Sequence, residues 1–180
     1  LDLPTIALVT PSYNQAQFLE QTLRSVLEQR YPRLEYVIMD GGSSDDSAAI
    51  IRRYETDLTY WVSQPDRGQA DAINKGFAHT TGDVLGWINS DDILLPGSLR
   101  RVGELFARYP QIAWITGMSA TIDASGRTTR MSPRTGKFTP LIRRGWYHGR
   151  LLGFIRQEST FWRRELWEKA GGYVDADLTY

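Results

Sequence analysis

Three absences limit what this sequence of 180 residues can do. It has no cysteine, which excludes disulfide bonds and thiolate metal sites. Its two histidines, His79 and His148, lack the spacing of a paired histidine metal motif. No apolar run reaches about 18 residues, so we expect no membrane-spanning helix. The N-terminal segment has no basic signal-peptide region, and the cytoplasm is therefore the expected compartment.

Charge is balanced over the whole chain but uneven along it. Residues 1–99 carry a net charge of −7 and residues 100–180 a net charge of +7. No acid lies between Ala124 and Gln157, an interval that holds the basic residues Arg127, Arg130, Arg134, Lys137, Arg143, Arg144, Arg150 and Arg156. This stretch is either a solvated face or a surface for an anionic partner. As a hypothesis, that surface steers a lipid-diphosphate or other anionic acceptor, or holds the protein at the anionic inner face of a membrane. Because the net charge is zero and no recognition motif is present, we expect no nucleic-acid partner.

The first hundred residues alternate between strand and helix signals. Short apolar, β-rich runs predict strands at 5–10, 36–39, 58–62 and 84–88, with a further strand at 113–116. Helical patterns follow Asn14, Asp45 or Asp46, and Asp66, the last of them to about His79, and a further helix is expected with Pro96 in its first turn. This alternation predicts an α/β fold with a mostly parallel sheet and helices on both of its faces.

Several residue pairs have the spacing of helix starts. Asn14 with Gln17, and Asp66 with Gln69, are spaced like a capping box. Asp45 or Asp46 is expected to cap the helix that runs through Ile50 and Ile51, and Pro96 fits the first turn of the helix after it. The helix after residue 14 is expected to bury one face made of Phe18, Leu19, Leu23, Val26 and Leu27.

Polar motifs follow four predicted strands in turn. They are Ser12–Asn14, Asp40–Ser43, Gln64–Gln69 and Asn89–Asp92. In open parallel sheets, ligands bind beyond the carboxyl ends of the strands. The four motifs should therefore lie along one edge of the sheet and form a binding site there.

Two adjacent carboxylates, Asp91 and Asp92, end the fourth of these motifs. Taken alone, the pair reads as a helix cap or a solvated loop. Beside the other strand ends, it indicates a site for Mg²⁺ or Mn²⁺, which take oxygen ligands and often use one or two carboxylates with substrate phosphates. The loop after Asp40 is not a P-loop and lacks the Gly-x-Gly-x-x-Gly pattern, so a bound diphosphate would need a metal.

The second half of the chain changes character. "TIDASGRTTRM" predicts a hairpin with its tip at 124–126, and residues 133–150 predict a long loop. A short strand is expected at 158–162, and a short helix at 165–170 that Gly171–Gly172 stop.

Four segments together resemble the family 2 glycosyltransferases, which have the GT-A fold. They are "TPSYNQAQFLEQTLRSVLEQRYP", "YVIMDGGSSDDS", "QPDRGQADAINKGFAHTTGDVLGWINSDD" and "RQESTFWRRELWEKAGGY", in family order and with family-like spacing. The resemblance implies one glycosyltransferase domain over 1–180. Residues 1–99 would be a Rossmann-like half that binds the nucleotide-sugar, and 100–180 an acceptor-side half that is incomplete at its C-terminus.

The activity implied by this resemblance is inverting transfer of a sugar from a UDP-, dTDP- or GDP-linked donor to a hydroxyl or amine. The acceptor would be a glycan or a lipid-linked molecule, in the synthesis of polysaccharide or cell-surface glycan. By the same resemblance, the residues that bind the donor would be Pro11, Ser12, Tyr13, Asn14, Asp40, Gly42, Asp66, Arg67, Gly68, Asp71, Asn74, Asn89, Ser90 and Asp91. Asp92, with Asp91, would hold Mn²⁺ or Mg²⁺ in a DXD-like motif, and Gln157, Glu158 and Ser159 would lie on the acceptor side.

The chain departs from the family pattern at three places. Gly41 follows Asp40 where a second acid is frequent, and Asn89 stands where the family has the first acid of Asp-x-Asp. The family's general base lies in an acidic motif that would begin near Tyr180, so we expect the base beyond this residue. The last acids, Asp175 and Asp177, are the remaining candidates, although neither matches the motif position.

Two other functions stay open from the sequence. A nucleotidyltransferase also uses acids at strand ends, but it normally has a Gly-rich, basic loop after its first strand, and Thr10–Asn14 is not one. A non-catalytic module that binds nucleotides or glycans would be compatible with the missing base.

Overall fold

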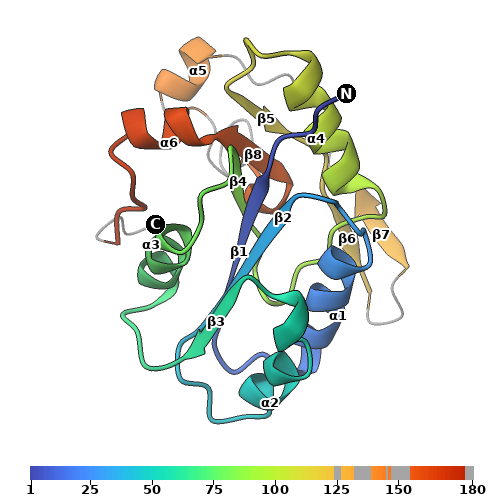
Figure 1. The fold of residues 1–180 in the computed structure, drawn as a ribbon, viewed down its shortest axis with the longest axis vertical. Coiled ribbons are helices and arrows are strands. Elements are labelled where there is room, and N and C mark those ends of the chain that lie inside the picture. The colour runs from blue at the N-terminus through green and yellow to red at the C-terminus, as the bar shows by residue number, and fades with distance from the viewer. Residues whose placement is uncertain (124–126, 132–138, 145, 147–154, 177–180) are drawn as a thin grey trace.

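A six-stranded sheet forms the centre of the computed structural model, in the order β3-β2-β1-β4-β8-β5 (Figure 1). The structure describes residues 1–123, 127–131, 139–144, 146 and 155–176. The strands of the sheet are β1 (Ile6–Ser12), β2 (Leu34–Asp40), β3 (Tyr60–Ser63), β4 (Val84–Trp87), β5 (Trp114–Thr116) and β8 (Thr160–Arg163). β1 to β4 are parallel, and β8 runs antiparallel to both β4 and β5.

Helices cover both faces of the sheet, as the sequence predicts. α1 (Ala16–Leu27), α2 (Ser47–Arg52) and α4 (Ser98–Arg108) pack on one face, and α3 (Gln69–Ala78) packs on the other (Figure 1). Successive residues of β1 alternate between them: Ile6 and Leu8 join the core under α1, whereas Ala7 and Val9 join the core under α3. The mostly parallel α/β architecture is confirmed.

The predicted capping box of α1 is wrong. The Asn14 and Gln17 side chains do not cap this helix, which has no side-chain cap hydrogen bond at its N-cap position. Instead, Asp45 from the loop before α2 accepts a hydrogen bond from the Ala16 N–H at 2.9 Å and one from the Ser47 N–H at 3.0 Å. One carboxylate thus serves the starts of two helices, and these hydrogen bonds, led by those with Ser47, lower the pKa of Asp45.

Other local expectations at helix starts are also wrong. Asp66 and Gln69 form no capping box, because Gly68 precedes α3 with φ 101 and Asp66 accepts from the Gly68 N–H instead. Pro96 lies before α4 rather than in its first turn, since Gly97 takes the left-handed conformation with φ 79 and the helix begins only at Ser98.

The buried face predicted for α1 is wrong at Phe18, whose side chain is 42% exposed. The buried side of this helix runs through Leu19, Leu23 and Val26 instead.

The second half keeps most of its predicted elements. β6 (Ala120–Ile122) and β7 (Thr128–Met131) form the hairpin, whose tip at 124–126 lies outside the described residues. Most of the predicted loop at 133–150 also lies outside them, apart from the short helix α5 (Thr139–Arg143) and a few neighbours. The 3₁₀ turn η2 (Gln157–Ser159) leads into β8, and α6 (Arg164–Lys169) ends before Gly171 and Gly172, both at positive φ. A further 3₁₀ turn, η1 (Glu55–Asp57), precedes β3. No helix in the described part is long and apolar enough to cross a membrane.

Candidate donor pocket

The carboxyl ends of the four parallel strands lie along one edge of the sheet. β1 ends level with β2 in the register Ser12 to Asp40, and β2 ends level with β3 in the register Asp40 to Ser63. A cavity of about 680 Å³ lies at this edge, and we name it the donor pocket after the ligand that the sequence predicts for this edge. Its lining is Pro11, Ser12, Tyr13, Gln15, Gly41, Gly42, Pro65, Asp66, Gly68, Gln69, Ala72, Asn89, Ser90 and Asp91. The predicted convergence of the strand-end motifs is therefore present.

Most residues assigned to the donor from the sequence line this pocket. They are Pro11, Ser12, Tyr13, Gly42, Asp66, Gly68, Asn89, Ser90 and Asp91. Three further lining residues, Gly41, Pro65 and Gln69, belong to the predicted strand-end motifs, although they were not among the residues assigned to the donor. Gln15 and Ala72 also line the pocket and were not predicted from the sequence.

The wall formed by β1 and β2 has two features suited to a polar ligand. Ser12 is 4% exposed, and its hydroxyl is buried with no hydrogen-bond partner among the described residues. A buried hydroxyl without a partner costs free energy, so a ligand that supplies one is favoured. Gly42 has φ 81, and a Cβ there would lie 3.0 Å from the Pro65 nitrogen, so only glycine lets this loop pack against Pro65.

Asp40 and Asn14 are both used within the protein and do not line the pocket. The Asp40 carboxylate is 2% exposed and accepts from the Ser43 N–H at 2.9 Å, the Ser43 hydroxyl at 2.5 Å and the Ser63 hydroxyl at 2.6 Å. Asn14, at φ 53, donates its N–H to the Ser43 hydroxyl and accepts from the Ser44 N–H. These bonds join the loops after β1, β2 and β3, so the two side chains shape the pocket, and any contact with a nucleotide base stays a prediction.

Three more predicted donor residues, from the segment that leads into α3, also lie outside the lining. Asp71 is 6% exposed and pairs with Lys75 at 2.7 Å and with Arg67 at 3.1 Å. The Lys75 ammonium and the Arg67 N–H hold the pKa of Asp71 at about 2. Asn74 bonds Val174 twice, accepting from its N–H at 2.7 Å and donating to its carbonyl at 2.9 Å, and so attaches the segment after α6 to α3.

The loop of Asp91 and Asp92 is fixed by side chains from distant elements. Thr22, buried on α1, places its hydroxyl 2.9 Å from the Ser90 carbonyl oxygen and 2.8 Å from the Asp92 carbonyl oxygen. On the other side, Gln69 donates to the Asn89 side-chain oxygen at 2.6 Å. The Asn89 oxygen that was expected to serve the donor or the metal is thus already an acceptor.

Asp92 is partly buried and lies close to two other acids. Burial, followed by the negative charges of Glu158 and Asp91, raises the pKa of Asp92 to about 6. The Gln157 amide opposes this shift by donating to the Asp92 carboxylate at 3.2 Å, and Asn89 also opposes it by a side-chain hydrogen bond. The other polar atom of the Gln157 side chain, Oε1, is buried and has no hydrogen-bond partner in the part of the chain that the structure describes.

The oxygen atoms around Asp92 are of the kind that binds a hard divalent cation. They are carboxylate and amide oxygens, and no described Lys, Arg or His forms a salt bridge with Asp91, Asp92 or Glu158. Within the described residues, however, no three acidic or histidine side chains are already gathered around one point. The protein would thus supply one or two carboxylates and leave the remaining positions to substrate phosphates and water.

The predicted acceptor-side residues lie next to this acidic loop. Glu158 and Ser159, in η2, line a second cavity together with Asp91 and Asp92, whereas Gln157 contacts Asp92 directly. Asp175 is exposed and lines neither cavity. Asp177 lies outside the described residues.

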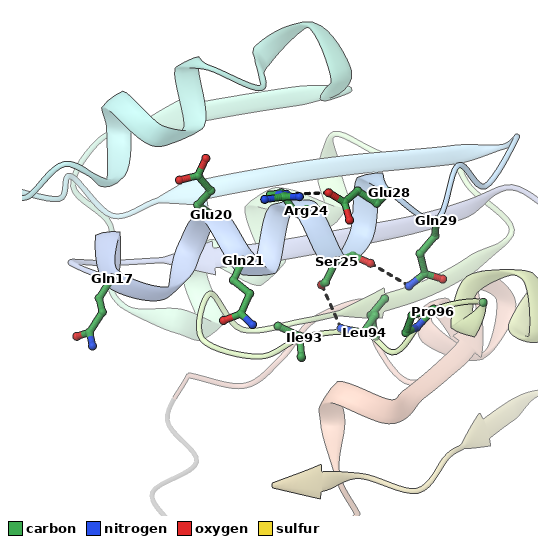
Figure 2. Close-up of a pocket in the computed structure, with 11 residues that line it drawn as sticks. Gln17, Glu20, Gln21, Arg24, Ser25, Glu28, Gln29, Ile93, Leu94 and Pro96 are labelled. Carbon is green, nitrogen blue, oxygen red and sulfur yellow. Dashed lines mark hydrogen bonds and ion pairs between the residues drawn. The ribbon is translucent and has the colours of Figure 1, made fainter. Parts of the chain in front are cut away.

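A groove of about 720 Å³ runs along the outer face of α1, and its residues help to position the acidic loop (Figure 2). Ser25 of α1 accepts from the Leu94 N–H at 3.1 Å. Gln29 donates to the Leu95 carbonyl at 3.3 Å and accepts from the Leu99 N–H at 2.9 Å, which caps α4. α1, through Thr22 and Ser25, and Gln29 just after it therefore hold the segment from Ser90 to Leu99.

Comparison with known proteins assigns the family. Residues 7–166 match the family model described as "Glycosyl transferase family 2". An uncharacterized glycosyltransferase of Mycobacterium tuberculosis is 43% identical over 90 residues, which are 49% of this chain and 34% of that protein. The poly-beta-1,6-N-acetyl-D-glucosamine synthase of Staphylococcus aureus is 29% identical over 118 residues, which are 64% of this chain and 29% of that enzyme. The chain thus spans about a third of the length of these relatives.

Solved structures agree on the fold. A mannosyltransferase from Pyrobaculum calidifontis, in complex with GDP-mannose and Mn²⁺, superposes with a TM-score of 0.70 at 24% identity, over 98% of this chain and 49% of that one. TarS of S. aureus, in complex with UDP-GlcNAc, gives a TM-score of 0.71 at 17% identity, over 95% of this chain and 48% of that one. At these identities the likeness concerns the fold, which is of the GT-A type. With residues 7–166 matched to its family model, the chain belongs to glycosyl transferase family 2.

Proposed function

We propose that this chain transfers a sugar, with inversion and with the help of a divalent cation, from a nucleoside diphosphate sugar to a hydroxyl or amine of an acceptor. The observation that carries the proposal is the donor pocket at the strand ends, bordered by Asp91 and adjoining the acidic loop of Asp92. Sheet edges of this kind take nucleotides in α/β proteins. Family neighbours in complex with GDP-mannose and with UDP-GlcNAc indicate the class of donor.

The chemistry follows from the charges at the pocket. A bound Mn²⁺ or Mg²⁺ would neutralise the charge that develops on the leaving diphosphate. In the proposal Asp92 is the main ligand of that ion, and Asp91 contacts a hydroxyl of the ribose or the sugar. The unpartnered Ser12 hydroxyl gives the donor one more hydrogen-bond partner inside the pocket.

The acceptor would approach from the side of Glu158 and Ser159, as proposed for residues 100–180. Its hydroxyl needs a general base as it attacks. Polysaccharide or cell-surface glycan is the proposed product class, since one family relative is a poly-N-acetylglucosamine synthase.

Donor binding tests this proposal without any acceptor. UDP-, dTDP- and GDP-sugars are each titrated into the chain with and without Mn²⁺, and the melting temperature and calorimetric heat are recorded. A ligand of the folded state raises the melting temperature by mass action, so at least one donor should stabilise the chain and should do so more strongly with Mn²⁺. No stabilisation by any donor in either condition would refute the proposal.

Two variants then separate the residues of the acidic loop. Asp92→Asn should abolish the effect of Mn²⁺ on donor affinity, whereas Asn89→Ala should only weaken it. Asp57→Asn is the matched control, because Asp57 is an exposed acid in η1 before β3, away from the strand ends. Equal Mn²⁺ dependence in the Asp92 and Asp57 variants would remove Asp92 from the metal site.

A non-catalytic binding module is the second candidate, favoured by the fact that neither described cavity is lined by a residue of the segment around Asp175. Release of free sugar from the donor in the presence of Mn²⁺, or its transfer to an acceptor, distinguishes the enzyme from the module. Donor binding without either reaction, also in a longer protein that includes the following segment, would favour the module.

Contact with an anionic membrane surface remains part of the proposal. Arg127, Arg130, Arg144 and Arg156 are exposed, whereas Arg134, Lys137 and Arg150 lie outside the described residues. Co-sedimentation with vesicles that contain anionic lipid should fall as salt rises, because the attraction is screened. Binding that is absent at low salt, or equal with neutral vesicles, would contradict the membrane contact.

A further inference from the structure

Gln69, the first residue of α3, is joined by its side chain to the acidic loop of Asp91 and Asp92. Its amide donates to the side-chain oxygen of Asn89, and the two atoms lie 2.6 Å apart. Both residues line the donor pocket, and Asn89 lies two residues beyond the end of β4. The hydrogen bond therefore connects α3, on one face of the sheet, to the strand end that carries the acids.

The backbone brings Asn89 and Asp92 next to each other. Residues 89–92 form a tight turn, in which the Asp92 N–H donates to the Asn89 carbonyl at 3.1 Å. The Asn89 side chain also forms a hydrogen bond with the Asp92 carboxylate. An ionised carboxylate only accepts hydrogen bonds, so the Asn89 NH₂ group is the donor.

These two side-chain hydrogen bonds fix the orientation of the Asn89 amide, whose oxygen faces Gln69 and whose nitrogen faces Asp92. An aspartate at this position could accept from Gln69 but could not donate to Asp92. It would also add a negative charge beside a carboxylate that already has Asp91 and Glu158 as neighbours. Of the two side chains, the amide is thus the one that can connect Gln69 to Asp92.

We infer that Gln69 is a positioning residue for Asp92 and acts through Asn89. Asn89 then orients the carboxylate that would bind the cation and is not itself a ligand of the ion, although it stands where the Asp-x-Asp pattern has its first acid. A second amide, that of Gln157 in η2, donates to the same carboxylate at 3.2 Å, so neutral donors from two parts of the chain hold Asp92 in one orientation. The inference rests on the proposed function, since it assigns Gln69 to the cation that this function requires.

The hydrogen bonds can be detected by NMR in the ¹⁵N-labelled chain, without metal or nucleotide. Asn89→Leu keeps the approximate size of the side chain and removes both of its side-chain hydrogen bonds. It should shift the side-chain NH₂ signal of Gln69 to the position of a solvent-exposed glutamine. The signal of Gln17, an exposed glutamine of α1 that does not line the donor pocket, is the control and should not move. An unchanged Gln69 signal would show that Gln69 and Asn89 are not bonded in solution and would overturn the inference.

Donor affinity with and without Mn²⁺ then tests the positioning role. Gln69→Met keeps the length of the side chain and removes its amide, and because Gln69 is exposed the variant should fold as the original chain does. The UDP-, dTDP- and GDP-sugars are titrated into each variant. Gln69→Met should reduce the gain in affinity that Mn²⁺ gives by about threefold to tenfold, the effect of one hydrogen bond, and should leave the metal-free affinity unchanged. Gln17→Met is the matched control and should change neither.

A double variant tests whether Gln69 acts through Asn89. If it does, Gln69→Met combined with Asn89→Leu should lose no more of the Mn²⁺ gain than Asn89→Leu alone. Losses that add up in the double variant would give Gln69 a separate role and would overturn the inference.

The other outcomes separate this inference from the proposed function. A full Mn²⁺ gain in Gln69→Met overturns the positioning role and leaves the transferase standing. A loss of equal size with and without Mn²⁺ makes Gln69 a direct contact of the donor and also overturns it. If the original chain binds no donor, or binds it without any gain from Mn²⁺, the proposed cation-dependent function fails, and the positioning role falls with it even where the NMR shift is seen.

Discussion

The Thr22 hydroxyl offers a test of how the acidic loop of Asp91 and Asp92 is held, because it joins α1 to the backbone on both sides of Asp91. Thr22 is fully buried, and its hydroxyl lies 2.9 Å from the Ser90 carbonyl and 2.8 Å from the Asp92 carbonyl. Thr22→Val keeps the shape of the side chain and removes its only donor. One hydroxyl hydrogen serves two acceptors, so the variant leaves buried carbonyl groups unsatisfied at a cost of about 1–3 kcal/mol.

This cost has two measurable consequences. For a chain of this length, it should lower the melting temperature by roughly 3–10 °C. It should also weaken Mn²⁺-dependent donor binding several-fold, because Asp92 is no longer held beside Asp91 in one geometry. Thermal unfolding and calorimetric titration of a nucleotide-sugar with Mn²⁺ measure the two effects. Thr22→Ser, which keeps the hydroxyl, should restore most of the donor affinity.

Thr80→Val is the matched control for Thr22→Val. Thr80 is also a buried threonine, and its hydroxyl donates to the Phe77 carbonyl and accepts from Arg164, away from the donor pocket. This variant should lose stability without losing Mn²⁺ affinity beyond what instability explains. If both variants bind donor and Mn²⁺ like the original chain, the Thr22 hydroxyl does not position the loop. A fully stable Thr22→Val variant would show that its two hydrogen bonds contribute no net stability.

Three further predictions concern pH and backbone. The pKa of Asp92 is raised to about 6, and a bound Mn²⁺ needs the carboxylate form. The affinity for Mn²⁺ should therefore be constant above about pH 7 and should fall as the pH drops through 6. In Mn²⁺ titrations, Asp92→Asn should remove this pH dependence. The pKa of Asp71 is lowered to about 2 in the folded protein, from about 4 in the unfolded chain. Its contribution to the free energy of unfolding is therefore present above about pH 4 and is lost as the pH falls toward 2. In urea unfolding, Asp71→Asn should lower the free energy of unfolding most near neutral pH and least in acid. Gly42→Ala forces a side chain into the left-handed region at φ 81 and against Pro65, so it should destabilise the chain by about 1–2 kcal/mol and weaken nucleotide binding, as thermal unfolding and titration would show.

The fold could be predicted from the sequence because its signals are local. Apolar runs such as Val84–Trp87 and the buried stripe of α1 follow the periods of a strand and of a helix. Helix starts could not be predicted in the same way, since their partners come from elsewhere in the chain. Asp45 serves α1 from a distance of 29 residues, and Gln29 serves α4 from a distance of 70. A capping box read from neighbouring residues cannot detect such partners.

The site shows the same division between local and distant signals. The carboxyl ends of parallel strands converge because of the sheet topology. The acids and glycines of four separate motifs could therefore be assigned to one site from the sequence. On α3, however, Gln69 and Ala72 face the donor pocket, whereas Asp71 and Asn74, each two positions further on, bond Lys75 and Val174. Helix rotation decides which pair meets a ligand, and that rotation is set by the packing of Ile73 and Phe77 against the sheet. A motif alone does not reveal it.

The surroundings of Asp92 explain why this carboxylate suits a cation better than a structural role. An arginine or lysine in the place of Gln157 would stabilise the ionised form and lower its pKa, as Lys75 and Arg67 do for Asp71. The chain instead places neutral amides beside Asp92 and adds two further acids, so that burial and repulsion raise the pKa to about 6. Holding the charge there is unfavourable until a positive partner arrives. A divalent ion would remove that penalty, and the electrostatic free energy so recovered would appear as affinity for the ion.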